Sequence, residues 1–162
     1  RRHQPVGGVE GVGGAARAVI WGLLKHKVAR ICIGVRNPGK VQPLVEAFEQ
    51  YAAIDVFHWE SEAFQKVLSE TDLLVNTTPL GMYPQVEAMP PVDWTCVAVR
   101  ALVYDIIYTP GKTRFLQQAE QHGHKILNGE HMLAGQGAAA FELWTGQKAD
   151  LAVMMEALRR AL

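Results

Sequence analysis

The stretch VEGVGGAARAVIW, Val9 to Trp21, decides how the rest of the chain is interpreted. Gly11, Gly13 and Ala16 fit the spacing G-x-G-x-x-[GA], and an apolar run with helical spacing follows them. In such a turn the first glycine allows a tight bend, the second lets a ligand approach the backbone, and the small third residue permits close packing of helix on strand. Free N–H groups at the start of the helix favour an anion. The pattern predicts a phosphate-binding turn, and a simple glycine-rich turn is the open alternative.

The composition of the 162-residue chain limits the classes of protein to which it can belong. With 49% hydrophobic and 20% charged residues, the chain is long enough for one well-buried domain. Sixteen basic and sixteen acidic residues give no electrostatic reason to expect a nucleic acid or an anionic membrane as partner. The apolar run after the glycines is broken by Lys25, His26 and Lys27, so it is too short to span a bilayer.

Cysteine usage and targeting patterns indicate the compartment. Cys32 and Cys96 both lie in apolar, strand-like segments, which favours reduced core thiols. We find no secretory or transmembrane pattern, and we therefore expect a cytoplasmic protein. His122 and His124 lie two residues apart, but no cysteine or carboxylate cluster joins them, so we expect no metal site.

Strand-like and helix-like segments alternate along the chain. The predicted strands after the glycines are RICIGV (30–35), IDVFHW (54–59), LLVNTT (73–78), CVAVRALVYDII (96–107) and HKILNG (124–129). The predicted helices cover 15–27, 41–52, 61–70 with Ser61 as N-cap, 113–123, 131–144 and 149–162. Residues 79–94 hold four prolines and are predicted to form a loop. This alternation predicts an α/β domain with a doubly wound, mainly parallel sheet covered on both faces.

The residues before the glycine-rich turn, HQPVGGVE (3–10), have the composition of a poor strand. The strand that precedes the turn should be central in a doubly wound sheet. There Glu10 would point a carboxylate into the sheet, and Gly7 and Gly8 would contribute no side-chain packing. Because an unpaired buried carboxylate is unstable unless protonated, we expect this strand to support the turn only weakly.

The end of the second predicted strand indicates which dinucleotide is bound. A site for NAD normally places an acid about twenty residues beyond the glycines, where it binds the adenosine ribose. This position holds Arg36, followed by Asn37, with Lys40 one turn further on. A guanidinium and an ammonium group suit a 2′-phosphate, so we predict NADP rather than NAD. A solvated turn arginine is the alternative.

Asn76, Thr77 and Thr78 end the predicted strand 73–78, beside the same crevice. Ligands of open α/β sheets bind outside the carboxyl ends of the strands, so these residues are candidates for the nicotinamide side of the path. A polar strand cap before Pro79 explains them equally well.

Four segments resemble the shikimate dehydrogenases, and they are spread so that the resemblance extends over nearly the whole chain: GVGGAARA (11–18), DLLVNTTPLG (72–81), VYDIIYTPGKTRFL (103–116) and NGEHMLAGQGAAAFELWTG (128–146). The last two are the more specific, because few dehydrogenases combine a tyrosine after the fifth strand with G-x-x-M-L-x-x-Q before a closing helix. The resemblance is to the NADP-binding and C-terminal part of that family. It implies a Rossmann-like fold and the NADPH-dependent, reversible reduction of 3-dehydroshikimate to shikimate in aromatic amino acid biosynthesis.

The resemblance also implies roles for individual residues. The pyrophosphate would lie on Gly11, Val12, Gly13, Gly14 and Ala15, the 2′-phosphate side on Arg36, Asn37 and Lys40, the nicotinamide between Ile106 and Gly129, and the shikimate against Tyr108 and Gln136. Tyrosine and glutamine suit a polyhydroxylated acid, because both can hydrogen-bond hydroxyl or carboxylate groups without bringing charge. Without the resemblance, a half-buried core tyrosine and a helix-surface glutamine would be the preferred interpretation.

The chain departs from the family pattern in ways that affect the expected activity. The family's catalytic lysine and aspartate lie in a substrate domain that precedes the glycine-rich turn, and no lysine here sits in that motif. We therefore assign no catalytic residue, and we expect NADP binding without turnover by this chain alone. Val35 stands where the family has asparagine and Asn37 where it has threonine, so contacts on the adenine side should differ in detail.

The expected organisation is one NADP-binding domain over residues 1–162, whose C-terminal helices (131–162) would pack toward the substrate domain. Without that domain, their apolar surface would favour a homo-oligomer. Two alternatives stay open. One is a quinate/shikimate dehydrogenase that uses NAD. The presence of Arg36 at the position where an NAD site normally holds an acid argues against it. The other is a non-catalytic binding or assembly module with a degenerate site.

Overall fold

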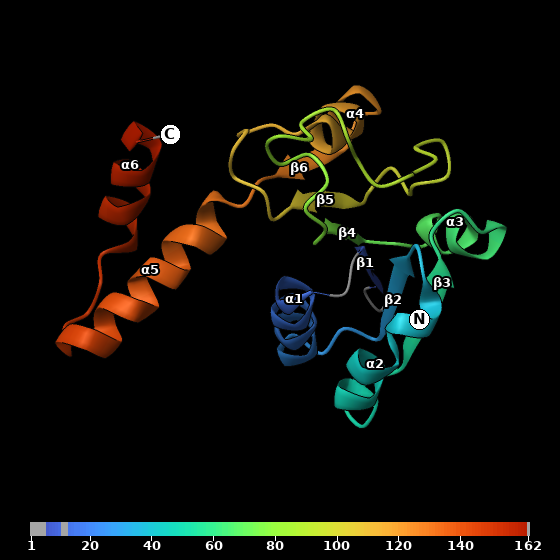
Figure 1. Cartoon of the computed structure of the whole chain (residues 1–162), viewed down its shortest axis with the longest axis horizontal. Coiled ribbons are helices and arrows are strands. Elements are labelled where there is room, and N and C mark those ends of the chain that lie inside the picture. Colours follow the sequence, from blue (N-terminus) through green and yellow to red (C-terminus); the bar gives the residue numbers. More distant parts are fainter. Residues whose placement is uncertain (1–5, 11–12, 162) are drawn as a thin grey trace.

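The computed structural model describes residues 6–10 and 13–161 (Figure 1). Within this part, one sheet of six parallel strands has the order β3-β2-β1-β4-β5-β6. Its strands are β1 (Val6–Glu10), β2 (Arg30–Val35), β3 (Ile54–His58), β4 (Leu73–Asn76), β5 (Leu102–Asp105) and β6 (Lys125–Leu127). The direction in which strands are added reverses between β1 and β4, so the predicted doubly wound α/β fold is confirmed.

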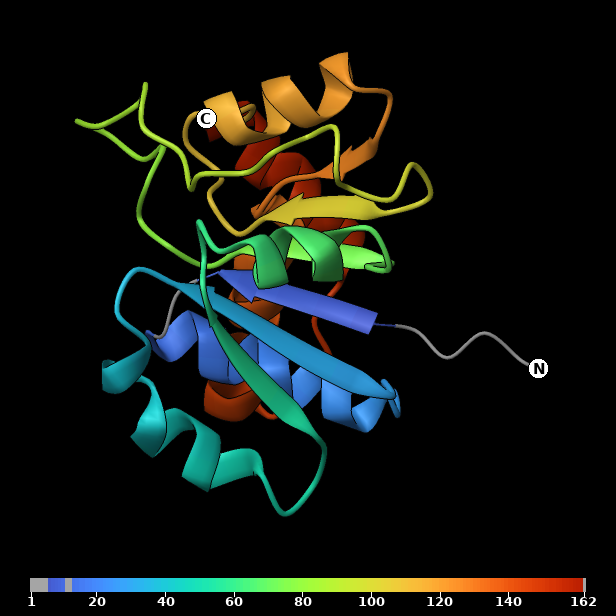
Figure 2. The ribbon, with the colours of Figure 1, turned by 90° about the vertical axis from the view of Figure 1, so that its right-hand side faces the viewer.

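Helices cover both faces of this sheet (Figures 1 and 2). They are α1 (Gly14–Lys25), α2 (Gln42–Phe48), α3 (Glu62–Leu68), α4 (Arg114–Gln121), α5 (Glu130–Thr145) and α6 (Leu151–Ala161), together with the short 3-10 helix η1 (Pro38–Lys40). Buried side chains of α1 and α2 share one core cluster, and those of α3 and α4 share a second. The predicted N-cap of α3 is present, because Ser61 Oγ accepts a hydrogen bond from the Phe64 amide at 3.2 Å.

Strand β2 shows how the two clusters meet across the sheet. Ile31 and Ile33 are fully buried against the helices of the first cluster. Gly34 faces the opposite side, where an added Cβ would lie only 2.4 Å from Cζ of Phe64. Since burying one large aliphatic side chain contributes about 1.5–3 kcal/mol, this alternation fixes the register of β2.

The segment that we expected to form a weak first strand is the central strand β1. Gly7 pairs with Ile31 on one side and with Leu73 on the other. A Cβ at Gly7 would lie 3.0 Å from Cδ1 of Leu23, so the glycine permits close packing of α1 on the strand. The backbone of Glu10 belongs to β1, and its side chain lies outside the described part of the structure.

The strand predicted over 96–107 is wrong at its first half, because β5 begins only at Leu102. The preceding apolar residues form turns in which the Ala98 amide donates to the Leu68 carbonyl (3.0 Å) and the Ala101 amide donates to the Ala98 carbonyl (2.8 Å). Val97 and Ala101 are nevertheless buried in the second core cluster. The apolar composition therefore reflects burial, while the backbone groups are satisfied locally rather than by a strand ladder.

Smaller differences concern where elements end. The helix predicted over 41–52 covers only Gln42–Phe48, and the strand predicted over 73–78 ends at Asn76. The two C-terminal helices pack on each other and project from the body of the domain (Figure 1). Leu143 and Trp144 of α5 are more than 80% exposed. No helix in the described ranges is long and apolar enough to cross a membrane.

Candidate functional site

Two neighbouring pockets lie at the carboxyl ends of the parallel strands. The pocket beside β2, of about 460 Å³, is lined by Arg36, Asn37, Lys40 and Trp59 among others. The pocket beside β5, of about 520 Å³, is lined by residues that include Ile106 and Tyr108. We call them the β2 pocket and the β5 pocket. Both are also lined by Gly13, Thr77, Thr78 and Pro79, so together they form one groove across the sheet edge.

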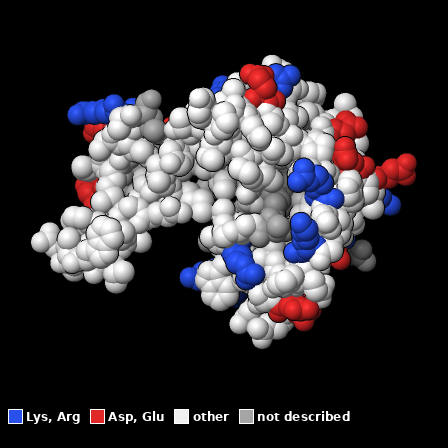
Figure 3. Space-filling model, in the orientation of Figure 1, with Lys and Arg blue, Asp and Glu red and all other residues white. Residues whose placement is uncertain are grey.

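The β2 pocket carries positive charge that the described residues leave unneutralised. Arg36 directly follows β2 and is exposed, as is Lys40 at the end of η1. Asn37 caps η1 by accepting a hydrogen bond from the Gly39 amide at 3.2 Å. Among the side chains that the structure describes, no carboxylate forms an ion pair with Arg36 or Lys40. Basic side chains gather around the hollow beside β2 and α1, which suits an anionic ligand (Figure 3).

The start of α1 opens into the same groove. Gly13 is the N-cap in extended conformation and provides no side-chain hydrogen bond to the first turn. A Cβ added at Gly13 or Gly14 would meet no described atom within 4 Å. Crowding within the described protein therefore does not explain glycine at either position, whereas a ligand lying on the backbone would. Ala15 lines the β5 pocket, and the predicted contacts Gly11 and Val12 lie outside the described residues.

The wall shared by the two pockets is held by a buried polar network. Asn76, at the end of β4, is fully buried and does not line either pocket. Its Oδ1 accepts hydrogen bonds from the Thr78 amide (2.9 Å) and hydroxyl (2.7 Å), and its Nδ2 donates to Asp105. Thr77 and Thr78 do line the groove. Asn76 thus lies behind the wall that it was predicted to form.

Asp105 is the centre of this network and was missed by sequence reasoning. The carboxylate is fully buried and accepts hydrogen bonds from the Thr113 hydroxyl (2.6 Å), the Ile107 amide (3.0 Å) and Asn76 Nδ2 (3.2 Å). Burial raises the pKa of the Asp105 carboxyl, and these hydrogen bonds oppose the rise. An acid inside the apolar run VYDII was the available signal, because a buried carboxylate needs partners.

Residues far apart in the chain meet behind the β5 pocket, where Gly129 packs on Ile106 without lining the pocket. Gly129 is buried, and a Cβ added there would lie 1.8 Å from the Ile106 carbonyl oxygen. The Gly129 amide donates to the Ile107 carbonyl at 3.0 Å. Tyr108 lines the pocket and is 39% exposed. Gln136 lies on the exposed surface of α5 and lines neither pocket.

Several apolar residues of the groove were not predicted. Trp59 directly follows β3 and lines the β2 pocket, while Met82 and Tyr83 line the β5 pocket from the loop after β4. The strand-end rule that selected Arg36 would also have selected Trp59, had it been applied to apolar as well as polar residues. The loop that carries Met82 and Tyr83 offers no such rule.

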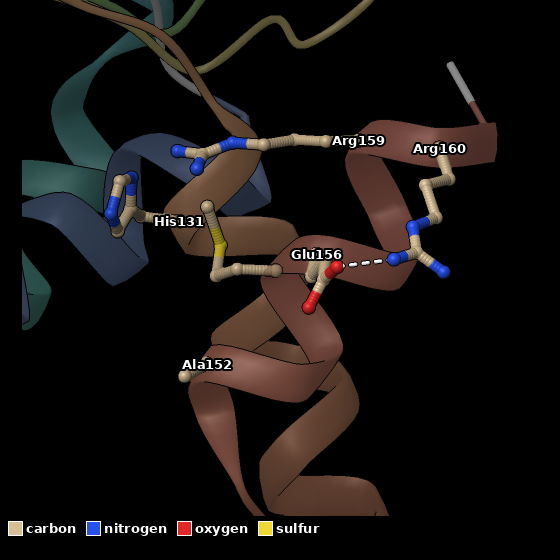
Figure 4. Close-up of a pocket in the computed structure, with 6 residues that line it drawn as sticks. His131, Ala152, Glu156, Arg159 and Arg160 are labelled. Carbon is tan, nitrogen blue, oxygen red and sulfur yellow. Dashed lines mark hydrogen bonds and ion pairs between the residues drawn. The ribbon is translucent and has the colours of Figure 1, made fainter.

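A third hollow, of about 370 Å³, lies between α5 and α6 (Figure 4). Its arginines already have acidic partners: Arg159 Nε lies 3.1 Å from Glu130 Oε2, and Arg160 pairs with Glu156. Hydrogen bonds from Asn128 and Arg159 lower the pKa of Glu130, which keeps this carboxylate charged. The β2 pocket is therefore the better anion site of the two.

The strand order, the glycine-lined start of α1 and the groove at the strand ends define a dinucleotide-binding domain of the Rossmann type. Residues 129–159 match the family model described as the Shikimate 5'-dehydrogenase C-terminal domain. The shikimate dehydrogenase (NADP(+)) of Crocosphaera subtropica is 40% identical over 158 residues, which are 94% of this chain and 54% of that protein. The chain is thus similar, over about half of their length, to the shikimate dehydrogenases, the family that its motifs resemble.

Solved structures agree with this relationship. Shikimate 5-dehydrogenase from Listeria monocytogenes in complex with shikimate and NAD superimposes with a TM-score of 0.87 at 29% identity, covering 95% of this chain and 55% of the other. The Thermus thermophilus enzyme in complex with NADP(H) and shikimate gives a TM-score of 0.80 at 35% identity, covering 96% and 55%. The chain thus spans about half the length of the relatives that it matches.

Proposed function

We propose that this chain binds NADP(H) along the groove and supplies the cofactor-binding half of a shikimate dehydrogenase. The 2′-phosphate lies in the β2 pocket at Arg36 and Lys40, and the pyrophosphate lies at the start of α1. The nicotinamide lies in the β5 pocket against Ile106, and Gly129 packs on the Ile106 carbonyl behind it. The observation that carries the proposal is the continuity of the groove, which joins Arg36 to Ile106 past the open glycine backbone.

The residues present fit NADP better than NAD. A carboxylate that binds the adenosine ribose hydroxyls is absent from the described lining of the β2 pocket, which offers Arg36, Asn37 and Lys40 instead. Charge-assisted hydrogen bonds to a phosphate ester are stronger than neutral ones. The curated relative named for NADP(+) and the solved complex with NADP(H) support the same choice, whereas the Listeria monocytogenes structure contains NAD.

The chemistry proposed for the complete enzyme is hydride transfer between NADPH and 3-dehydroshikimate, which gives shikimate. The cofactor supplies the hydride, and the chain orients it against a substrate that hydrogen-bonds Tyr108, with Gln136 as the further contact implied by the family. No lysine, histidine or carboxylate is found among the described residues that line the β5 pocket. The described lining therefore offers no lysine–carboxylate pair for the proton transfer, and we propose that the isolated chain binds cofactor without turnover.

The exposed apolar surface of α5 includes Phe141, Leu143 and Trp144. Such a surface fits a chain that binds the cofactor and contacts a separate substrate domain. We propose that residues 1–162 form a single cofactor-binding domain whose C-terminal helices pack toward a substrate domain. An exposed apolar surface of this kind also favours self-association of the chain by itself.

Cofactor titrations of the wild-type chain and of Arg36→Ala test the proposal. If Arg36 binds the 2′-phosphate, the substitution should weaken NADP⁺ binding by about 1.5–3 kcal/mol and leave NAD⁺ binding nearly unchanged. Arg30→Ala is the matched control, because Arg30 lies at the other end of β2 and pairs with Asp55 at 2.7 Å. Equal losses for both cofactors in Arg36→Ala would contradict the assignment.

The same titrations separate the alternatives. A preference of the wild-type chain for NAD⁺ would favour a quinate/shikimate dehydrogenase, and a folded chain that binds neither cofactor would favour a non-catalytic module. Turnover is measured as NADPH oxidation on addition of 3-dehydroshikimate. Oxidation by the isolated chain at an ordinary enzymatic rate would overturn the proposal that it is inactive alone.

A further inference from the structure

We propose that Asp105 is a positioning residue that holds the two walls of the β5 pocket at a fixed separation, so that it controls binding of the nicotinamide half of the cofactor without touching it. The inference rests on the proposed function, because it assigns the β5 pocket to nicotinamide. The last residues of β4 and β5, Asn76 and Asp105, are register partners in the sheet. The two walls of the pocket start directly after them.

The first wall follows from the orientation of the Asn76 amide. Only the NH₂ group of Asn76 can donate to the Asp105 carboxylate, so the amide oxygen must face Thr78. There it accepts hydrogen bonds from both the amide and the hydroxyl of Thr78. The Thr78 hydroxyl accepts in turn from the Leu80 amide at 3.2 Å. Asp105 thus determines the path of the loop that carries Thr77, Thr78 and Pro79.

The second wall is held by the same carboxylate. Oδ1 accepts from the Ile107 amide at 3.0 Å, which sets the course of the chain between Ile106 and Tyr108. Oδ2 accepts from the Thr113 hydroxyl at 2.6 Å, and Thr113 is buried and caps α4. Both oxygens are therefore used, and they join the loops after β4 and β5 to the start of α4. A buried network with every member satisfied rigidifies its surroundings.

The network reaches the β2 pocket only at the shared wall, through Thr78 and Leu80, and does not hold the basic groups of that pocket. Asn37 and Lys40 are held by η1. The Gly39 amide donates a hydrogen bond to Asn37 Oδ1, and the Lys40 amide donates one to the Asn37 carbonyl at 3.1 Å. None of the network's described hydrogen bonds reaches η1. Loss of the carboxylate should therefore weaken the nicotinamide side selectively, whereas a general loss of stability would affect both pockets alike.

The experiment compares Asp105→Asn with Thr71→Val. Thr71 is also fully buried, and its hydroxyl donates to the Val67 carbonyl at 3.0 Å, but it lines neither pocket. Each variant is titrated with NADP⁺ and with adenosine 2′,5′-bisphosphate, which lacks the nicotinamide half. In Asp105→Asn we expect the Kd of NADP⁺ to rise by about tenfold and that of the bisphosphate to change by less than about twofold. Thr71→Val should change neither Kd by more than that.

A second pair of variants keeps the inference testable if Asp105→Asn does not fold. Thr113→Val removes the hydroxyl that donates to Asp105, and Thr113→Ser retains it. Thr113→Val should reproduce the selective loss of NADP⁺ binding, and Thr113→Ser should restore wild-type affinity. Equal losses for both ligands, unchanged NADP⁺ binding, or no rescue by serine would each overturn the proposal.

A measurement without cofactor separates this proposal from the proposed function. Hydrogen exchange of the Thr78, Leu80 and Ile107 amides should accelerate by about tenfold in Asp105→Asn and Thr113→Val, and remain unchanged in Thr71→Val. If the wild-type chain binds neither ligand, the proposed function fails, and the exchange rates still decide the role of Asp105. Unchanged exchange at these three amides would overturn that role.

Discussion

The β2 pocket and the β5 pocket share a wall but are built in different ways. In the β2 pocket, the groups suited to a ligand are exposed side chains on a short loop, and Arg36 directly follows a strand. In the β5 pocket, the shape of the walls is set by buried groups, above all Asp105, that line no part of it. The β2 pocket therefore offers exposed charged side chains to a ligand, whereas the shape of the β5 pocket depends on buried residues behind its walls.

This difference determines how each pocket should respond to substitution. An exposed cation can be removed without a cavity or an unpaired buried group, so the consequence is confined to binding. A change in the layer behind the β5 pocket alters packing or hydrogen bonding in the core, so stability and binding change together. Substitutions of glycines at the two sites probe this distinction directly.

The largest effect is expected from Gly129→Ala. Its Cβ would lie 1.8 Å from the Ile106 carbonyl oxygen and 2.5 Å from the carbonyl carbon, so the backbone itself must move. Overpacking of this kind costs about 1–3 kcal/mol and occasionally more, and a backbone clash belongs at the upper end. Urea denaturation should show the lost stability, and NADP⁺ titration should show weaker binding, because Ile106 lines the β5 pocket.

Gly137→Ala is the control for that substitution. Gly137 lies inside α5, where an added Cβ meets no described atom within 4 Å. Alanine is favoured over glycine in a helix interior by about 1 kcal/mol, so this variant should be slightly more stable than wild type. Similar stabilities for Gly129→Ala and Gly137→Ala would contradict the close packing of α5 on the loop after β5.

A smaller loss is expected from Gly34→Ala, in the strand that leads to the β2 pocket. The new Cβ would lie 2.4 Å from Cζ of Phe64, and this ring is fully buried. Because a side chain rather than backbone must yield, we expect destabilisation of about 1–2 kcal/mol in urea denaturation. Phe64→Leu in the same chain should recover part of that loss. Additive losses in the double variant would show that the two residues do not compete for space.

The sequence predicted those parts of the molecule that depend on local pattern. The doubly wound order follows from the alternation of strands and helices, and the position of Arg36 follows from its place after β2. Strand ends of a parallel sheet lie on one edge, so Arg36 and Thr77 could be placed near each other without coordinates. Both line the β2 pocket.

The parts that the sequence did not predict depend on contacts between distant segments. The segment that contains Gly7 has the composition of a weak strand, yet this glycine allows Leu23 to pack closely on β1. The mainly apolar segment 96–101 resembles a strand in its composition. Its amides nevertheless donate hydrogen bonds within turns, as Ala101 does to the Ala98 carbonyl, or to the Leu68 carbonyl. Asp105 requires Thr113 and Asn76 as partners, and no spacing rule connects these three positions.

The smallest predicted effect concerns pH, and it again falls in the half of the sheet supported by buried groups. His124 is buried beside Trp94, with ring centroids 5.9 Å apart, and its Nδ1 has no hydrogen-bond partner among the described residues. Burial lowers the pKa of His124 from its ordinary value of 6.5, and a hydrogen bond to the Ala101 backbone only partly opposes this. The unfolded chain therefore binds a proton at a higher pH than the folded chain does.

Stability should consequently fall as the pH decreases through 6.5 and below, because protons then favour the unfolded state. His124→Gln should flatten this dependence between about pH 7.5 and pH 5.5 in urea denaturation, whereas His26→Gln, at an exposed position, should retain it. A wild-type slope in His124→Gln would mean that another group governs the acid response.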